Sequence, residues 1–188
     1  DYQINVKQLA TPAAVVVGDL KAKFNSQYAG NLPSDIQLQV QINSNGTIVT
    51  RDITVSLDSS TTEANFGIKV SSAINNALKN DGIYAYYDST LDKLILSTKQ
   101  TGSNLTLTLN NADNISTTAP SSVSGSGQDA KVDIIDKFGN QTLDVTSSTN
   151  TFNLYGISIT VNKLTNGYKS FSISKDIDAV VNNIKDFI

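Results

Sequence analysis

The sequence predicts an α+β fold that is predominantly β, with two small domains of antiparallel sheets and one or two packed helices. Apolar and polar side chains alternate with a two-residue period in several segments, most clearly over residues 36–42. Turn dipeptides such as Asn45-Gly46 and Asn166-Gly167 separate these segments. One internal stretch, residues 60–82, carries start, face and stop signals of a helix. Short strands joined by hairpins, with few helices, indicate this fold class.

The composition argues against catalysis. The 188 residues contain no His, Cys, Met or Trp and a single Glu, whereas Ser, Thr and Asn account for 61 positions. The commonest general base and metal ligand is therefore missing, as are thiol nucleophiles, thiolate metal sites and disulfides. We expect the protein not to be an enzyme and to have no catalytic, cofactor-binding or metal-ligating residues.

Charge and hydropathy exclude two further classes of partner. The net charge of −3 offers no basic stripe for a phosphate backbone, so no nucleic acid is expected. No apolar run approaches the roughly 20 residues that span a bilayer, so no membrane insertion is expected. The chain starts at Asp1 without a Met and stops at Ile188 within an apolar helical stripe, which indicates an internal fragment.

The first thirty residues are read from alternation and turn chemistry. Residues 2–6 alternate as a half-buried strand does, and Pro12 breaks the pattern. Residues 13–28 mix an apolar run with a helix-like stretch, so that strand and helix both remain open there. Residues 31–34, Asn-Leu-Pro-Ser, are typical of a turn.

A long hairpin and a helix follow. Residues 36–42 and 49–57 form the two strands around Asn45-Gly46. Ser60 and Glu63 fit a capping box, in which Ser60 is the N-cap and Glu63 reaches back to it. The helical face then comprises Phe66, Val70, Ala73, Ile74, Ala77 and Leu78. Gly82 suits the left-handed C′ position.

The remaining strands complete two β-rich units. Strands are expected over residues 83–87, 94–96 and 105–109, which makes residues 36–109 a β-β-α-β-β-β unit with one helix on one antiparallel sheet. Residues 110–128 are expected to be a linker, since Asn, Ser, Thr and Gly dominate there. Further strands are expected at 132–135, 142–145, 157–161 and 171–173, before a helix from Ser174 to Ile188.

Three motifs carry a chemical alternative beside a structural one. Asp88 and Asp92 bracket a turn, and bonding of their own backbone is favoured over a cation site because the ordered calcium-loop pattern is absent. Residues 167–170, Gly-Tyr-Lys-Ser, lack the first glycine of a phosphate loop. Alternation places Tyr84 and Tyr86 on one face of the strand and Tyr87 on the other. For this cluster of three tyrosines, packing in the core and at the sheet edge is favoured over a platform that binds sugar or protein.

Three ordered stretches give the chain its resemblance to a known family. They are residues 2–10, YQINVKQLA; then Ala73-Ile74-Asn75-Asn76 followed by segments at 82–85, 94–97 and 101–102; then segments at 127–130, 150–152, 154–161 and 184–188. In this order and spacing the sequence resembles the flagellar filament cap, the hook-associated protein 2 family. The terminal coiled-coil segments and most of the helical leg of that family are absent, and residues 13–36 match no motif of it.

The resemblance implies a head made of a distal domain inserted into a proximal one. Residues 1–12 and 166–188 would form the base that joins a truncated helical leg, residues 13–32 and 113–165 the proximal β-rich domain, and residues 33–112 the distal α+β domain.

The resemblance also implies a structural function without a cofactor. The head would belong to a homo-oligomeric ring at the extracellular tip of the bacterial flagellum, where the cap guides polymerisation of exported flagellin. The expected partners are flagellin subunits and other cap protomers, and the isolated fragment is expected to be monomeric or weakly associating. The alternative is a surface adhesin that binds a host glycan or protein.

Overall fold

A computed structural model describes residues 1–154 and 156–173. All strand pairs in these residues are antiparallel, and the predicted β-dominated α+β class is confirmed. The expected terminal helix from Ser174 to Ile188 lies outside the described residues.

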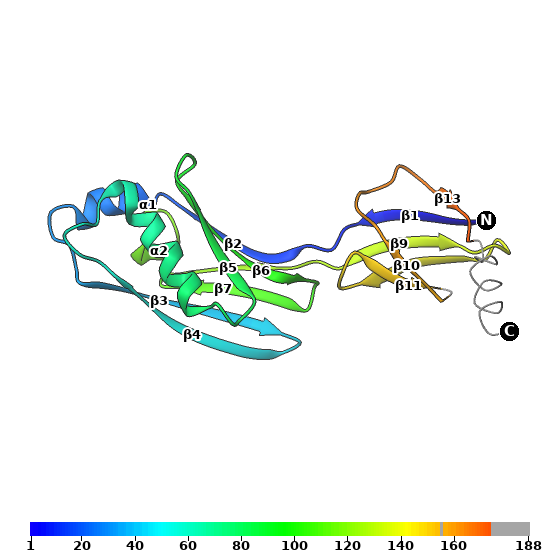
Figure 1. The fold of residues 1–188 in the computed structure, drawn as a ribbon, viewed down its shortest axis with the longest axis horizontal. Helices are drawn as coiled ribbons and strands as arrows, with labels where there is room; N and C mark the ends of the chain where they lie inside the picture. The colour runs from blue at the N-terminus through cyan, green and yellow to red at the C-terminus, as the bar shows by residue number, and fades with distance from the viewer. Residues whose placement is uncertain (155, 174–188) are drawn as a thin grey trace, which may run out of the picture.

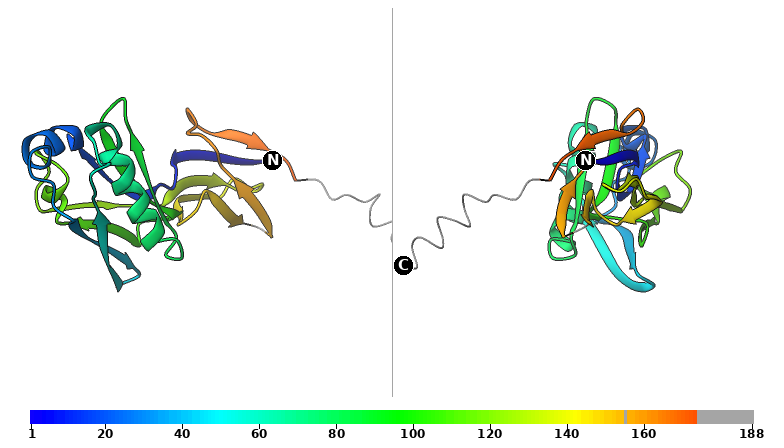
Figure 2. Two further views of the ribbon diagram at one scale, coloured as in Figure 1. Left: turned by 60° about the vertical axis from the view of Figure 1, so that its left-hand side comes forward. Right: turned by 90° about the vertical axis from the view of Figure 1, so that its right-hand side faces the viewer.

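The molecule is elongated and has two lobes that lie along its longest axis (Figure 1). We define the larger lobe as residues 11–127 and the smaller lobe as residues 1–10 and 128–173, because two separate apolar cores fall in these ranges. The left-hand view of Figure 2 shows the same separation. The larger lobe is thus an insertion between two segments of the smaller one.

Two sheets and a long helix make up the larger lobe. One sheet has the order β4-β3-β7-β8 and the other the order β2-β6-β5. Their bounds are β2 Pro12–Gly18, β3 Asp35–Ser44, β4 Thr47–Ser56, β5 Ile83–Asp88, β6 Lys93–Thr101, β7 Leu105–Asn110 and β8 Ser122–Ser126. The helical elements are α1 Leu20–Lys23, a π-helical turn η1 Phe24–Tyr28, α2 Glu63–Ala77 and a 3₁₀ turn η2 Ala112–Asn114.

The predicted hairpin is confirmed as β3 and β4, which pair in register from Asp35↔Ser56 to Ser44↔Thr47. Asn45 and Gly46 both have positive φ, 53° and 82°, as a tight hairpin turn requires. Ile36, Leu38 and Val40 are buried on one face, which is the two-residue period seen in the sequence.

Two predictions for the larger lobe are wrong. The predicted strands form two sheets and not one. β3, β4 and β7 share one sheet, to which β8 adds, whereas β5 and β6 form the other, to which β2 adds. The expected linker at 110–128 contains β8 and the turn η2, which buries Ala112. The hydroxyl groups of Ser124 and Ser126 form cross-strand pairs with those of Thr108 (2.8 Å) and Thr106 (3.2 Å).

The ambiguous segment at 13–28 contains both elements in succession, strand β2 and then the helical turns α1 and η1. Residues 13–32 were expected to belong with the proximal domain. In the structure Val15, Val17 and Leu20 lie in the core of the larger lobe, because β2 adds to the edge of β6. Residues 113–126 join that lobe as well, through buried Ile115 and the pairing of β8.

The start of α2 is shifted from its predicted position. Thr62 is the N-cap, and its N–H donates to the Asn65 side-chain oxygen at 2.8 Å in a capping box. Ser60 instead hydrogen-bonds to Asp58, and Glu63 is the first helical residue. Gly82 has the predicted positive φ (67°), but it lies in the turn before β5 because the helix already ends at Leu78. Asn65, and not Glu63, is the N3 residue that completes the capping box.

The buried face of α2 explains a glycine inside a helix. Phe66, Val70, Ile74 and Leu78 are fully buried, in agreement with the predicted stripe. A Cβ on Gly67 would lie 2.4 Å from ring atoms of Tyr87. The helix therefore accepts the low helical propensity of glycine so that Tyr87 of β5 can pack against it.

The smaller lobe is a four-stranded sheet with the order β10-β9-β1-β13, together with a hairpin of β11 and β12. The bounds are β1 Tyr2–Gln8, β9 Ala130–Ile135, β10 Gln141–Ser147, β11 Thr151–Leu154, β12 Ile157–Thr160 and β13 Lys169–Phe171. Its core consists of Ile4, Val6, Ala10, Ala130, Val132, Ile134, Phe152 and Val161. The predicted strands at 2–6, 132–135, 142–145 and 157–161 all fall within or overlap these elements.

Candidate functional site

The two aspartates considered as a cation site have separate structural roles. One carboxylate oxygen of Asp88 accepts hydrogen bonds from the N–H groups of Thr90 and Leu91, at 2.9 and 3.0 Å, which is the predicted turn. Asp92 accepts instead from the Tyr87 hydroxyl (2.7 Å) and from the N–H of Lys21 (3.1 Å) at the start of α1. Within residues 1–154 and 156–173, no group of three or more acidic side chains could hold a metal ion.

The residues that resemble the end of a phosphate loop lie in a different local structure. Gly167 has φ 76° in a turn, and Lys169 belongs to β13, where it pairs with Ile4 of β1. A phosphate loop needs a following helix whose N–H groups surround the phosphate. An extended strand directs successive N–H groups to opposite sides, so these residues form no such site.

The tyrosines of β5 divide between the two faces of the sheet, as predicted. Tyr87 is buried against α2, and burial, together with its hydrogen bond to Asp92, raises the pKa of its hydroxyl. Tyr84 and Tyr86 are 48% and 58% exposed on the outer face. Tyr86 pairs with Ile95 of β6, which pairs with the half-exposed Val16 of β2. These side chains make a short apolar row across three strands.

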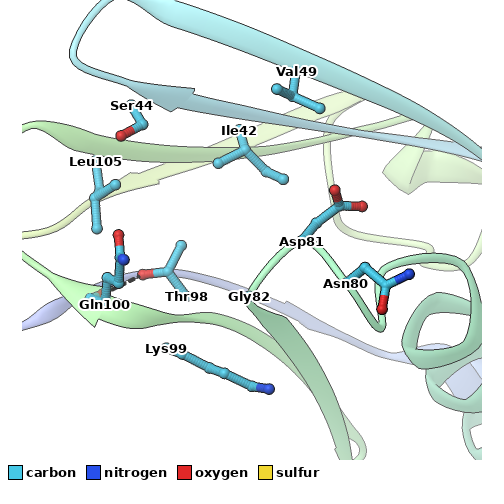
Figure 3. Close-up of a pocket in the computed structure, with 10 residues that line it drawn as sticks. All are labelled: Ile42, Ser44, Val49, Asn80, Asp81, Gly82, Thr98, Lys99, Gln100 and Leu105. Atoms are coloured by element: carbon cyan, nitrogen blue, oxygen red, sulfur yellow. Dashed lines mark hydrogen bonds between the residues drawn. The ribbon is translucent and has the colours of Figure 1, made fainter.

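A cleft opens where the two sheets of the larger lobe diverge, with a volume of about 460 Å³ (Figure 3). Ile42 and Val49 line one wall, and Thr98 and Gln100 of β6 line the opposite one. The Thr98 hydroxyl donates a 2.7 Å hydrogen bond to the Gln100 carbonyl.

The one carboxylate in the lining of this cleft is neutralised. Arg51 donates to both Asp81 oxygens, at 2.9 and 3.0 Å. This bidentate pair raises the pKa of the Arg51 guanidinium and engages both Asp81 oxygens in a salt bridge. The cleft therefore offers shape and apolar surface, and not a set of groups suited to acid–base chemistry.

A charged cluster in the smaller lobe connects three strands of its sheet. The Lys7 ammonium lies 2.8 Å from Asp133 and 3.1 Å from Asp144. Asp133 is 4% exposed on the central strand β9 and also accepts the N–H of Asp144 at 2.8 Å. Both flanking strands have an irregular register at this point, between Val6 and Gln8 in β1 and between Thr142 and Val145 in β10.

The ionisation of this cluster favours an ion pair. Burial opposes the charge on Asp133, but the Lys7 ammonium and the Asp144 N–H outweigh it, and the pKa of the carboxyl lies below its ordinary value. Hydrogen bonds to Asp133 and Asp144 raise the pKa of Lys7. A catalytic lysine or acid needs shifts in the opposite directions, so the cluster fits a structural role.

No helix in the described part of the chain is long and apolar enough to cross a membrane. A comparison with curated protein sequences finds no match. Two crystal structures of the D2-D3 domains of the flagellar cap protein FliD from Serratia marcescens have the same fold. One is 20% identical, with a TM-score of 0.55, covering 91% of this chain and 92% of that one. The other is 18% identical, with a TM-score of 0.53, covering 89% and 90%.

A family model matches part of the sequence directly. It is that of the flagellar hook-associated protein 2 C-terminus, and it matches residues 127–188. The match covers about a third of the chain. The described part of the match contains β9 to β13 of the smaller lobe. The likeness to the two crystal structures extends the shared fold over both lobes. Neither comparison supports the adhesin alternative.

Sequence reasoning missed the pair Lys7 and Asp133. They are more than a hundred positions apart, and an isolated Lys or Asp in a strand gives no sign of its partner. The signal that the sequence did contain was the charged residue Asp133 within the otherwise apolar run from Val132 to Ile135. An isolated charge among buried strand positions indicates a partner on a neighbouring strand.

Proposed function

We propose that the chain is the head of a flagellar cap protein, which sits as a ring at the growing filament tip and guides exported flagellin subunits into place. The observation that carries this proposal is the match of residues 127–188 to the hook-associated protein 2 C-terminus, continued by a shared fold over nine-tenths of the chain. The partners would be flagellin and other cap protomers, and the location the extracellular tip of the flagellum.

The geometry supports a role in which shape matters. The described residues form two lobes along one axis, and the chain passes from one lobe to the other near Thr11 and near Gln128 (Figure 1). The charged clusters around Asp133 and around Arg51 are ion pairs that fit structural roles. Such a molecule is suited to presenting surfaces at a distance from its base.

The proposal is tested by deleting the gene for the full-length protein in its own bacterium. We expect flagellin to be exported into the medium without polymerising, so that filaments are short or absent and swimming is lost. Expression of the full-length protein from a plasmid should restore filaments. Normal filament length and swimming in the deletion strain would contradict the proposal.

A second variant tests the contribution of the larger lobe. Thr11 and Gln128 are joined by backbone hydrogen bonds of 2.9 and 3.1 Å, so a short Gly-Ser linker can replace residues 12–127 of the full-length protein. The matched control inserts the same linker in the exposed turn between Ser89 and Thr90, which leaves the lobe in place. We expect filament growth to be reduced by the replacement and unchanged by the insertion.

A further inference from the structure

The connection between the lobes is more than two strands crossing from one to the other. Thr11 and Gln128 exchange backbone hydrogen bonds of 2.9 and 3.1 Å where the chain enters and leaves the larger lobe. The Thr11 carbonyl also accepts the N–H of Gly102, at 3.2 Å. Gly102 belongs to the β6–β7 turn, so a third segment meets the two crossing strands.

The β6–β7 turn is bonded to the smaller lobe by side chains on both sides of Gly102. The Thr101 hydroxyl donates to the carbonyl of Ser148, in the turn between β10 and β11, at 2.6 Å. The Asp129 carboxylate accepts the N–H and the hydroxyl of Ser103, at 2.7 and 2.8 Å. These bonds hold the pKa of Asp129 below its ordinary value, and the Gln8 side chain of β1 donates to the Asp129 carbonyl at 2.8 Å.

The crossing is also too tightly packed for its segments to slide. A Cβ on Gly127 would lie 2.4 Å from the Gly102 carbonyl oxygen and 2.8 Å from that of Thr11. These atoms belong to backbone that is itself hydrogen-bonded, so neither can move away as the end of a flexible side chain would. Gly127 is therefore required for the three segments to approach one another.

We propose that this junction, held by Asp129, Ser103, Thr101 and Ser148, locks the two lobes at one angle so that they move as a single rigid body. Two crossing strands alone form a hinge, because a change in a few backbone dihedrals swings the attached lobe. The third segment removes this freedom, since any swing must break charge-assisted hydrogen bonds to Asp129. The inference rests on the junction geometry and holds whether or not the chain guides flagellin.

The lock is measured by the distance between spin labels on the two lobes, by double electron–electron resonance. The sequence has no cysteine, so the exposed residues Asn76 of α2 and Thr146 of β10 can be replaced by labelled cysteines without competing sites. We expect one narrow distance distribution in the otherwise unaltered chain. A broad or multiple distribution there would overturn the proposal.

Variants at the junction then test which groups form the lock. Asp129→Ala combined with Ser103→Ala should broaden the distribution, with loss of the single narrow distance. The matched control is Asp136→Ala, because Asp136 accepts comparable hydrogen bonds from Phe138 and Asn140 within the smaller lobe alone. The distribution should stay narrow in this control.

Amide exchange separates unlocking from unfolding. Protection of the β3 and β9 amides should remain as in the unaltered chain while the distance distribution broadens. If the double variant loses this protection, the milder Ser103→Ala alone is measured in its place. A distribution that stays narrow in a folded junction variant would overturn the proposed role of Asp129 and Ser103.

Discussion

The two lobes differ in what stabilises them. In the larger lobe 25 buried apolar residues form one cluster between two sheets and α2. The smaller lobe has eight such residues among those described, and its central strand carries the buried Asp133. Burial of apolar surface contributes about 25 cal/mol per Å². The larger lobe is therefore stabilised mainly by the burial of apolar surface, whereas the smaller lobe depends more on specific ion pairs and hydrogen bonds.

Their chain topology differs as well. The larger lobe is one continuous segment whose ends meet at Thr11 and Gln128. In the smaller lobe β1 pairs with β9 and β13. These partners lie on the other side of the inserted lobe in the sequence, so the sheet joins segments that are more than a hundred residues apart. If the larger lobe unfolds, the smaller one must close a loop of roughly a hundred residues, at an entropic cost of about 4 kcal/mol. The larger lobe should thus tolerate loss of the smaller one, and not the reverse.

The largest expected effect comes from separating the lobes. A peptide of residues 11–128 should fold alone and keep the protected amides of β3, β6 and α2, because it contains the entire larger core. Residues 1–10 joined by a short linker to 128–188 should also fold, because the linker removes the long loop, but with a lower stability than the 11–128 peptide, since their core has only eight buried apolar residues among those described. Circular dichroism with amide exchange measures both. An unfolded 11–128 peptide would show that the lobes are one cooperative unit.

Next in size is a cavity in the larger core. Phe66 is fully buried beside Phe24 and Tyr28, with ring centroids 5.6 and 5.8 Å away. Phe66→Ala should lower the free energy of unfolding by about 3–5 kcal/mol. Phe138→Ala is the matched control, since Phe138 is 77% exposed in the β9–β10 turn, and its effect should stay below about 1 kcal/mol. Urea denaturation measures both, and equal effects would contradict the core assignment.

At Gly67, helix propensity and packing make opposite contributions to the change in stability when alanine replaces glycine. In an exposed helix, Gly→Ala stabilises by about 1 kcal/mol. Here the new methyl would meet the Tyr87 ring, which is buried and held by its hydrogen bond to Asp92, so Gly67→Ala should destabilise by about 1–3 kcal/mol. Thermal unfolding decides the sign. A stabilised variant would mean that the Tyr87 ring moves away easily.

The shifted helix start predicts a smaller effect within the larger lobe. Thr62→Ala removes the N-cap side chain of α2 and should cost about 1 kcal/mol. Glu63→Gln keeps the length of the side chain and should change the stability by only a few tenths of a kcal/mol. The same denaturation experiment compares the two. A larger cost at Glu63 would restore the capping box that the sequence suggested.

The smallest expected effect is a dependence on pH, since Lys7 is 38% exposed and water screens its ion pair. The pKa of Asp133 is lowered in the fold, so the pair stabilises the smaller lobe above the ordinary value of 3.8 and this contribution is lost as the pH falls through the folded value. The pKa of Lys7 is raised, so its contribution is present below 10.5 and is lost as the pH rises through the folded value.

Two matched variants assign this dependence to a lobe. Amide exchange of β9 is measured on both sides of pH 3.8 in the unaltered chain and in Asp133→Asn, which should flatten the acid dependence there. Asp58→Asn should act on the larger lobe only, because hydrogen bonds from Ser60 and then Lys69 lower the pKa of Asp58 to about 2. An unchanged acid dependence of β9 in Asp133→Asn would assign it to another group.

Local pattern was sufficient where one face of an element is buried. The alternation over residues 36–57 predicted β3 and β4 with their turn, and the stripe from Phe66 to Leu78 predicted the buried face of α2. It failed at residues 110–128, where a run of Ser and Thr suits a linker and an edge strand equally. The turn at Asp88 was predicted, because turn hydrogen bonds involve only sequence neighbours, whereas Asp92 accepts hydrogen bonds from Tyr87 and Lys21, which the sequence did not indicate.

The sequence by itself determined most of the strands, the β3–β4 hairpin and the long helix, because each depends on residues that are close in the chain. Only the tertiary structure decided which strands share a sheet, which lobe residues 13–32 join, and that Lys7 meets Asp133. Those outcomes depend on contacts between distant segments. An alternating strand can satisfy its apolar face against any of several partners, and the choice is made by the packing of the whole molecule.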